Sequence, residues 1–252
     1  MTELAYLPDV SEAYVRSFRA RVVALPPGAI VLDRTYFYPA GGGQPCDRGT
    51  LERADGARFE VVDVVKSGPA VVHRLRPLRA GAPRPAIGDE LTGTIDWERR
   101  HRHMRLHTAQ HLLSARIFER TGRRTRKATF SGVTALLELD GPVAADAAAL
   151  CEEDLRAAAA APEPVTVRHV ARAEWDRHPQ SARSGLVPLP PQVDPVRVVE
   201  IDGLDTCPCG GTHLRTTAEI GTVRVAPPEP LPDGGTRVTL TLEPTDAPAP
   251  SA

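Results

Sequence analysis

RLHTAQHLLSARIF, residues 105–118, sets the architecture of the second half of this chain. Its apolar residues recur at spacings of three and four, which is typical of the buried face of a helix. The pattern continues on both sides and a C-cap glycine, Gly122, follows it, so we predict a helix over 98–120. His107 and His111 lie four residues apart and therefore on one face of this helix, one turn from each other. Both imidazoles can aim at one point.

A second pair of metal-binding side chains lies downstream, in the glycine-rich stretch CPCGGTH. Cys209 and His213 are again four residues apart, and either pair alone is a weak signal because such residues are often solvated or packed. Together they offer one sulfur and three imidazoles, a donor set that suits tetrahedral Zn²⁺. The chain has only eight histidines and four cysteines. We therefore predict one shared metal site over the alternative of unrelated polar residues.

Composition indicates an ordinary globular protein. The 252 residues are 41% hydrophobic and 25% charged, with a formal net charge of -1. No apolar run approaches the roughly 20 residues of a membrane span, and the first residues lack a signal-peptide core. The cysteines, at positions 46, 151, 207 and 209, do not resemble a disulfide framework. We expect a protein of the reducing cytoplasm without membrane contact.

Basic residues gather on both sides of the predicted histidine helix. One group covers 99–105 and the other 116–127. Such clusters suit a polyanion such as RNA, with Arg102, Arg105, Arg124 and Lys127 as candidate RNA contacts. A solvated arginine-rich face explains the charge equally well. Charge alone does not separate the two interpretations.

The pattern of elements predicts an α+β fold in two modules. Strand-like runs separated by Gly and Pro fill 1–95 and predict a β-barrel-like N-terminal module, with a loop over 77–90. Residues 96–243 predict a two-layer α/β module in which the histidine helix packs on a sheet. This module includes an alanine-rich helix over 144–161 and strands such as VTVRHV, VRVVEIDG, AEIGTVRVA and TRVTLTLEP. The tail, 244–252, is expected to be disordered.

A run of three glycines marks a second unusual stretch. Gly41, Gly42 and Gly43, followed by Gln44, let the backbone adopt positive φ angles or approach another surface closely. A phosphate-binding loop is the alternative, but the Lys-Ser/Thr of a P-loop is missing and no helix follows. A tight turn is the preferred interpretation.

These motifs resemble a known family when taken in order. YFYPAGGGQP (36–45), HTAQHLLSA (107–115) and CGGTH (209–213) are similar to the editing domain of alanyl-tRNA synthetase, and especially to the free-standing AlaX-type alanyl-tRNA editing proteins. RVVEID (197–202) and TAEIG (217–221) extend the resemblance over nearly the whole chain.

The resemblance implies an aminoacyl-tRNA hydrolase, the medium-length class of the family, and the zinc ligands His107, His111, Cys209 and His213. Its substrate would be tRNA for alanine that wrongly carries serine or glycine, Ser-tRNA(Ala) or Gly-tRNA(Ala), cleaved at the ester in trans. The partner would be the acceptor end of that tRNA. A monomer without an obligate protein partner is expected.

One stretch departs from the synthetase-linked pattern. There a Gln-Lys-Gly-Ser run follows the helix, whereas this chain reads RKATFS over 126–131, and Val133 replaces the usual histidine. Free-standing members tend to show Thr-x-Ser, so Thr129 and Ser131 are the candidate catalytic residues that contact substrate. Their hydroxyls could equally bond to the strand backbone. This departure leaves the basis of amino-acid discrimination open.

Other functions remain open at this point. The motif could belong to a zinc hydrolase of a small ester or amide, although Thr108 stands where a His-Glu-x-x-His metalloprotease carries its general base. Structural zinc could instead shape a non-catalytic RNA-binding module. In an editing enzyme zinc would serve as template and Lewis acid, with water placed partly by the terminal adenosine's own hydroxyl. Cys207 is an alternate ligand or, by preference, a buried small residue.

Overall fold

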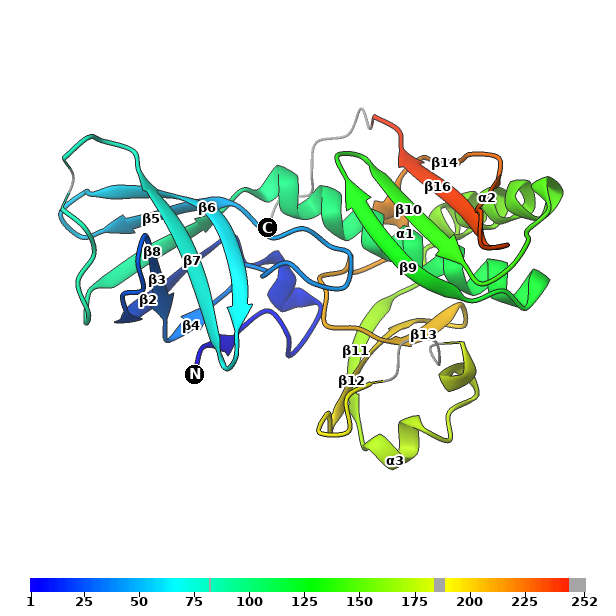
Figure 1. The fold of residues 1–252 in the computed structure, drawn as a ribbon, viewed down its shortest axis with the longest axis horizontal. Helices are drawn as coiled ribbons and strands as arrows, with labels where there is room; N and C mark the ends of the chain where they lie inside the picture. The colour runs from blue at the N-terminus through cyan, green and yellow to red at the C-terminus, as the bar shows by residue number, and fades with distance from the viewer. Residues whose placement is uncertain (82, 184–188, 245–252) are drawn as a thin grey trace. The chain divides into compact units, whose positions relative to one another are not determined.

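The computed structural model describes residues 1–81, 83–183 and 189–244, which form two compact units. Among the described residues, the first unit is Met1–His101 and the second begins at Arg102. The division falls inside helix α1, Trp97–Thr121, which contains the predicted helix and is one residue longer at each end. Of the predicted disordered tail, all but Pro244 lies outside the described residues. The α+β class is confirmed (Figure 1).

A closed six-stranded barrel forms most of the first unit. Its strands are β2 (Ser17–Ala24), β3 (Ala29–Leu32), β5 (Gly49–Arg53), β6 (Arg58–Ser67), β7 (Ala70–Pro77) and β8 (Glu90–Ile95). They are hydrogen-bonded in the order β2-β3-β7-β6-β5-β8, and β8 pairs back with β2. Because the sheet closes, no barrel strand has a free edge. Strand β5 has the sequence GTLER, which carries only a weak strand pattern.

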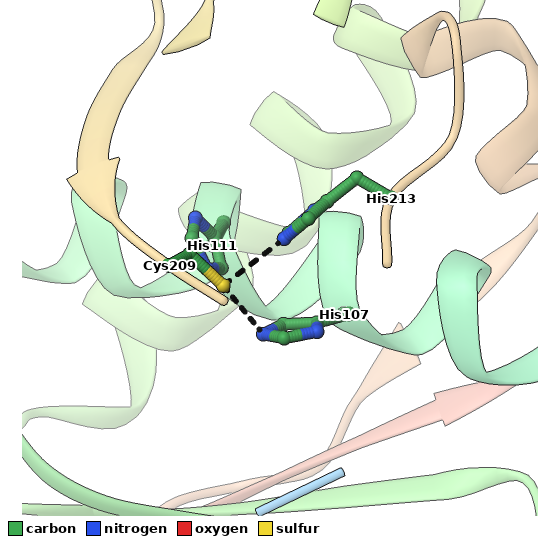
Figure 2. Close-up of side chains that lie close together, drawn as sticks. All are labelled: His107, His111, Cys209 and His213. Atoms are coloured by element: carbon green, nitrogen blue, oxygen red, sulfur yellow. Dashed lines mark hydrogen bonds between the residues drawn. The ribbon is translucent and has the colours of Figure 1, made fainter. Parts of the chain in front are cut away.

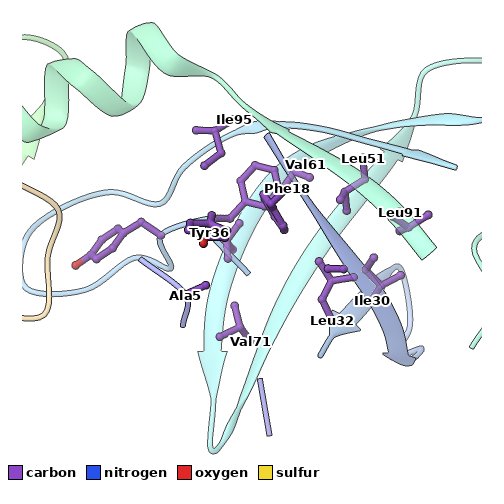
Figure 3. Close-up of a cluster of buried hydrophobic side chains, with 14 of the residues drawn as sticks. Ala5, Phe18, Ile30, Leu32, Tyr36, Leu51, Val61, Val71, Leu91 and Ile95 are labelled. Atoms are coloured by element: carbon purple, nitrogen blue, oxygen red, sulfur yellow. The ribbon is translucent and has the colours of Figure 1, made fainter. Parts of the chain in front are cut away.

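Alternation along the strands builds the barrel core (Figure 3). In β2, Phe18, Ala20 and Val22 are buried while the residues between them are exposed. Gly93 of β8 pairs with Phe18, and a Cβ at this glycine would lie 2.6 Å from the phenyl ring. Glycine is therefore required there by the close approach of the ring.

The stretch 29–38 does not form one continuous strand. After β3 the chain leaves the barrel, and β4 (Arg34–Thr35) pairs in parallel with β1 (Glu3–Leu4). A 3-10 helix, Ser11–Tyr14, lies between β1 and β2.

The glycine run forms the tight turn that the sequence predicts. Gly41 and Gln44 exchange backbone hydrogen bonds of 3.1 and 3.0 Å, and Gly42 and Gly43 between them have φ of 56° and 85°. Two consecutive positive φ values are the conformation of a two-residue hairpin turn, which favours glycine at both positions. Gln44 is buried beside this turn.

A buried ion pair lies in the first unit. Arg100 and Asp47 both have fully buried side chains, and the guanidinium binds the Asp47 carboxylate as well as the carbonyl oxygens of Ala13 (2.7 Å) and Tyr36 (2.5 Å). A buried guanidinium needs such acceptors because it cannot lose its charge. Arg100, part of the basic group over 99–105, is therefore a structural residue.

A β-sheet together with helices α1 and α2 forms the larger part of the second unit. Strands β9 (Thr125–Ser131), β10 (Thr134–Leu139), β14 (Val223–Val225) and β16 (Thr236–Leu242) pair in the order β14-β16-β10-β9, and β15 (Glu229–Pro230) pairs with β16. Figure 1 shows α1 and α2 (Ala145–Ala160) behind this sheet. Part of the predicted strand AEIGTVRVA is instead a 3-10 helix, Thr217–Ile220, against which α2 packs.

The two faces of this sheet differ. Ala135, Leu137 and Leu139 of β10 are buried, and their register partners in β9 and β16 share that face. The opposite face carries Lys127, Thr129 and Ser131 of β9, all exposed. A bulge between Glu138 and Leu139 shifts the register of this pair of strands. Thr125 at the start of β9 therefore pairs with Leu139 and lies on the same face as Leu139.

A separate three-stranded sheet carries the second ligand motif. Strands β11 (Val165–Val170), β12 (Val196–Ile201) and β13 (Asp205–Pro208) pair in that order and all antiparallel. The sequence suggested one sheet for the whole module and a turn, not a strand, at Cys207. Between β11 and β12 lie α3 (Arg172–Trp175) and a second 3-10 helix, Pro179–Ala182. Trp175 packs there against Val196 and Val198.

No helix in the described ranges is long and apolar enough to cross a membrane.

Candidate metal centre

Four side chains from two distant segments converge in the second unit (Figure 2). One donor atom from each of His107, His111, Cys209 and His213 lies within 4.8 Å of the other three. The Cys209 Sγ is 3.5 Å from His107 Nε2 and 3.3 Å from His213 Nε2. The three histidines are buried and Cys209 is half-buried. The cluster predicted from the sequence is therefore assembled by the fold.

The spacing of these donors fits a metal ion. In a tetrahedral zinc site with Zn–N of about 2.0 Å and Zn–S of about 2.3 Å, the N···S edge is about 3.5 Å. Both measured N···S separations are close to this value. The donor set, one thiolate sulfur and three imidazoles, is also of the soft and borderline type that zinc accepts. The residues present therefore fit the ion that the family resemblance implies.

Local structure explains how each pair is presented. On α1, four residues make one turn, so the rings of His107 and His111 lie 5.0 Å apart between centroids. Cys209 follows β13 directly, and its backbone N–H bonds to Arg197 O at 3.2 Å. The glycines after it let the chain turn, and the Gly211 N–H donates to the Cys209 sulfur at 3.3 Å. His213 then lies with its ring centroid 4.3 Å from that of His107.

Two of the histidines have a polar partner on the ring nitrogen that faces away from the cluster. His111 Nδ1 is 3.0 Å from Asp205 Oδ2. His213 Nδ1 is 3.2 Å from Thr108 Oγ1, which also accepts the Leu214 N–H at 3.1 Å. Because a carboxylate only accepts, Nδ1 of His111 carries a proton. Nε2 is then the ring nitrogen that would bind a metal, with release of its own proton.

Burial and neighbouring side chains both shift the pKa values of the cluster residues. Burial raises the pKa of the Cys209 thiol, but Coulombic interactions with His107 and His213 and hydrogen bonds from the histidines outweigh it and hold this pKa well below its usual value. Burial, followed by the charge of His107, lowers the pKa of His213 well below its usual value. Burial also lowers the pKa of His111, but the hydrogen bonds to Asp205 and Cys209 raise it well above the ordinary range. A thiolate is thus favoured, as metal binding requires.

The structure does not bring Thr129 and Ser131 to the cluster. Phe130, between them in β9, is buried and lies with its ring 5.3 Å from that of His107. Neighbouring residues of a strand point to opposite faces, so Thr129 and Ser131 project from the exposed face. Their contact with substrate stays a prediction that this placement does not support. Val133 is exposed in the turn that follows.

The basic residues predicted to contact tRNA have varied surroundings. Arg105 is buried, and its Nε donates to Ile220 O at 2.8 Å, so its contact with tRNA stays a prediction that this placement does not support. Arg124 pairs with Asp140 at 3.0 Å, and Arg102 is half-buried. Lys127 is exposed on the open face of β9.

Other arginines of the group over 116–127 bind acids of the same unit. Arg116 pairs with Glu119, Arg120 with Asp154, and Arg126 with Asp233. This pairing favours the interpretation of an arginine-rich surface with its charge largely balanced.

Cys207 does not join the cluster in the described part of the chain. It is half-buried on β13, its pKa is raised by burial, and its sulfur contacts Pro208 O at 3.7 Å. The structure thus leaves it a thiol beside the centre.

Sequence analysis missed the residues behind the ligands. Thr108 was noted only because it stands where a metalloprotease carries its general base. No role was predicted for Asp205, Arg183 or Phe130. A signal existed for Asp205, because it precedes Cys207 by two residues and so shares its face of β13, directly ahead of the ligand Cys209. No comparable signal exists for Arg183, which contacts Asp205 only through the fold.

Comparisons with known proteins agree with the motifs. A model for class II (A) tRNA synthetases matches residues 11–99, and one for the second additional domain of threonyl and alanyl tRNA synthetases matches residues 196–238. The alanyl-tRNA editing protein AlaX-M of Methanosarcina acetivorans is 36% identical over 89% of this chain and 92% of its own length. That of Methanosarcina mazei is 35% identical over 89% and 90%. Alanine--tRNA ligase of Pyrobaculum neutrophilum is 36% identical over 96% of this chain, which spans 28% of that ligase.

Proposed function

Because the chain belongs to the family of AlaX-type alanyl-tRNA editing proteins, we propose that it hydrolyses the ester of tRNA(Ala) wrongly charged with serine or glycine. Likeness over nearly the full length of the AlaX-M relatives supports a free-standing enzyme that acts in trans. The observation that carries the proposal is the convergence of His107, His111, Cys209 and His213. We further propose that these residues hold Zn²⁺.

The chain's own residues would form and shape this centre. Zinc, when bound, supplies positive charge and Lewis acidity at the ester. Cys209 contributes the thiolate, and His111 and His213 present Nε2 because Asp205 and Thr108 engage their Nδ1 atoms. Phe130 packs against His107 and keeps water from that side. Four protein donors complete a tetrahedral shell, which supports a role in positioning the substrate.

Recognition of the amino acid and the tRNA is the finer part of the proposal. A site that hydrogen-bonds the serine hydroxyl would reject alanine, which lacks it. Lys127 and Arg102 remain candidates for contacts with the phosphates of the acceptor end, whereas Arg105 does not.

Turnover of charged tRNA tests the function directly. The protein should release serine or glycine from mischarged tRNA(Ala) and leave alanyl-tRNA(Ala) largely intact. His107→Ala should abolish release, while the matched substitution His169→Ala, at an exposed position of β11, should not. If no amino acid is released from any of the three charged tRNAs by zinc-loaded protein, hydrolysis is wrong, and tight binding of the same tRNA would then indicate the non-catalytic RNA-binding module.

A further inference from the structure

Asp205 is a buried carboxylate with two cationic or polar partners. Its side chain has no exposed area, and it lies at the first position of β13, four residues before the ligand Cys209. One oxygen, Oδ2, is 3.0 Å from His111 Nδ1, and the other, Oδ1, binds Arg183 Nη2. An ionised carboxylate in such a place is costly unless both oxygens are engaged.

Arg183 supplies the opposite charge beside this carboxylate. It follows the 3-10 helix Pro179–Ala182, and its side chain is only 7% exposed. That helix packs against β13. The described segment 171–183, which carries α3 and this helix, is joined to Asp205 by this ion pair and supplies none of the four clustered donors.

We propose that Asp205, held by Arg183, is the positioning residue that orients His111 for metal binding. This inference rests on the metal centre of the proposed function. A carboxylate on Nδ1 fixes the tautomer and the ring plane, and it makes Nε2 a better donor. Loss of the carboxylate would leave the ring free to rotate and to carry its proton on Nε2.

The alternative is that Asp205 serves only to attach the segment 171–183 to β13. In that case its removal lowers stability without changing the affinity for metal. The neutral partner on His213, the Thr108 hydroxyl, shows that a ring nitrogen in this cluster can be held without a charge. Affinity for the metal separates the two roles, because a merely structural ion pair would not change it.

The test measures Zn²⁺ affinity of purified full-length protein by competition with a chromogenic chelator. Asp205→Ala should weaken Zn²⁺ binding by about 10- to 100-fold, and Asp205→Asn, which keeps an acceptor oxygen, should recover part of the loss. Arg183→Met should weaken it less, and should add nothing in the Asp205→Ala background because Arg183 acts through Asp205. Asp154→Asn, which breaks the partly exposed pair with Arg120, is the matched control.

A second readout is the visible absorption of the Co²⁺-substituted protein. Rotation of His111 should change the ligand-field bands in Asp205→Ala, and circular dichroism should show that the fold is retained; if that variant does not fold, Asp205→Asn and Arg183→Met decide. Zn²⁺ affinities within about threefold of the unsubstituted protein in all folded variants would overturn the positioning role alone. Failure of the unsubstituted protein to bind Zn²⁺ would instead overturn the metal centre and the proposed function with it.

Discussion

The barrel unit and the ligand-bearing unit both bury histidine and charged side chains, but the two units surround them differently. In the barrel, His73 is fully buried and its Nε2 lies 2.9 Å from Thr35 Oγ1. In the second unit, three histidines and a thiol turn their donor atoms toward one another. A buried histidine is thus no sign of function by itself. Convergence of lone-pair donors on one point is the informative feature.

The charged groups of the two units differ in the same way as the buried histidines. Arg100 lies among the Asp47 carboxylate and two carbonyl oxygens, so its charge is balanced within the barrel unit. In the cluster of the second unit, the four donor atoms face one another, and none of the four side chains carries a permanent positive charge. Such a set is stabilised by a bound metal ion or by protons.

The largest expected effect comes from exchanging one cysteine in each unit. Cys209→Ser should remove most of the bound zinc and lower serine release from Ser-tRNA(Ala) by about 100-fold or more, since a poorer ligand replaces the thiolate. Cys46→Ser, at a half-buried barrel thiol near Asp63, should change neither. Metal content and single-turnover hydrolysis are the measurements. Equal behaviour of the two variants would remove the distinction between the units.

Breaking the barrel ion pair should act on stability and not on metal. Asp47→Ala leaves the Arg100 charge buried without its carboxylate, which should cost about 3–5 kcal/mol of unfolding free energy. The partly exposed pair of Arg120 and Asp154 is the control, and Asp154→Ala should cost about 1 kcal/mol or less. Urea unfolding gives both values. Zinc affinity of folded Asp47→Ala should match that of the unsubstituted protein, and a large loss would show that the barrel supports the metal centre.

Acid should destabilise the barrel through His73. Burial lowers the pKa of His73 from 6.5 to about 4, so the folded state keeps a neutral ring where the unfolded chain binds a proton. Stability is therefore intact above pH 6.5, falls as the pH drops toward 4, and loses about 3 kcal/mol over that window. The unfolding free energy of unsubstituted protein and His73→Gln, measured at several pH values, should differ in slope within this window. Parallel curves would contradict the assignment.

Substitution of each of the two lysines of the chain compares RNA binding by the surfaces of the two units. Lys127→Ala should raise KM for charged tRNA by about two- to threefold and reduce the salt dependence of binding by about one ion, as expected for one phosphate contact. Lys66→Ala, at an exposed position of barrel strand β6, should do neither. Salt titrations of binding provide the measurement, and the reverse ranking would place the RNA on the barrel.

The smallest effect is expected at Thr129. Its place on the exposed face of β9 predicts that Thr129→Val and Ser131→Ala change serine release by no more than about twofold. Initial rates with Ser-tRNA(Ala) and Gly-tRNA(Ala) test this. A selective loss of serine release of tenfold or more in Thr129→Val would restore the sequence-based assignment and show that substrate reaches this face.

Sequence reasoning was sufficient where the signal is local. The 3.6-residue period located α1, and Gly122, with φ of 70°, ends it as predicted and bonds to Phe118 O at 2.7 Å. The alanine-rich helix agrees with its predicted range to within one residue at each end. Periodicity failed where pairing is non-local, because it did not separate the β11-β12-β13 sheet from the β14-β16-β10-β9 sheet.

The candidate site divides in the same manner. The four ligands follow from residue type and i, i+4 spacing, which are properties of the chain itself. The side of β9 that faces the centre does not follow, since alternation distinguishes two faces without saying which one is covered. The burial of Arg105 did not follow either, because a guanidinium looks alike in sequence whether it is exposed or bonded to a buried carbonyl.

By itself, the sequence determined the helix with His107 and His111, the Cys209 and His213 turn, and the family to which the chain belongs. Tertiary structure decided that these segments meet, that Asp205 and Arg183 stand behind His111, and that Arg100 and Arg105 are structural. The physical reason is range. Helical period and turn chemistry act between near neighbours, whereas a buried ion pair or a shared ligand set exists only once strands far apart in the chain are paired and packed.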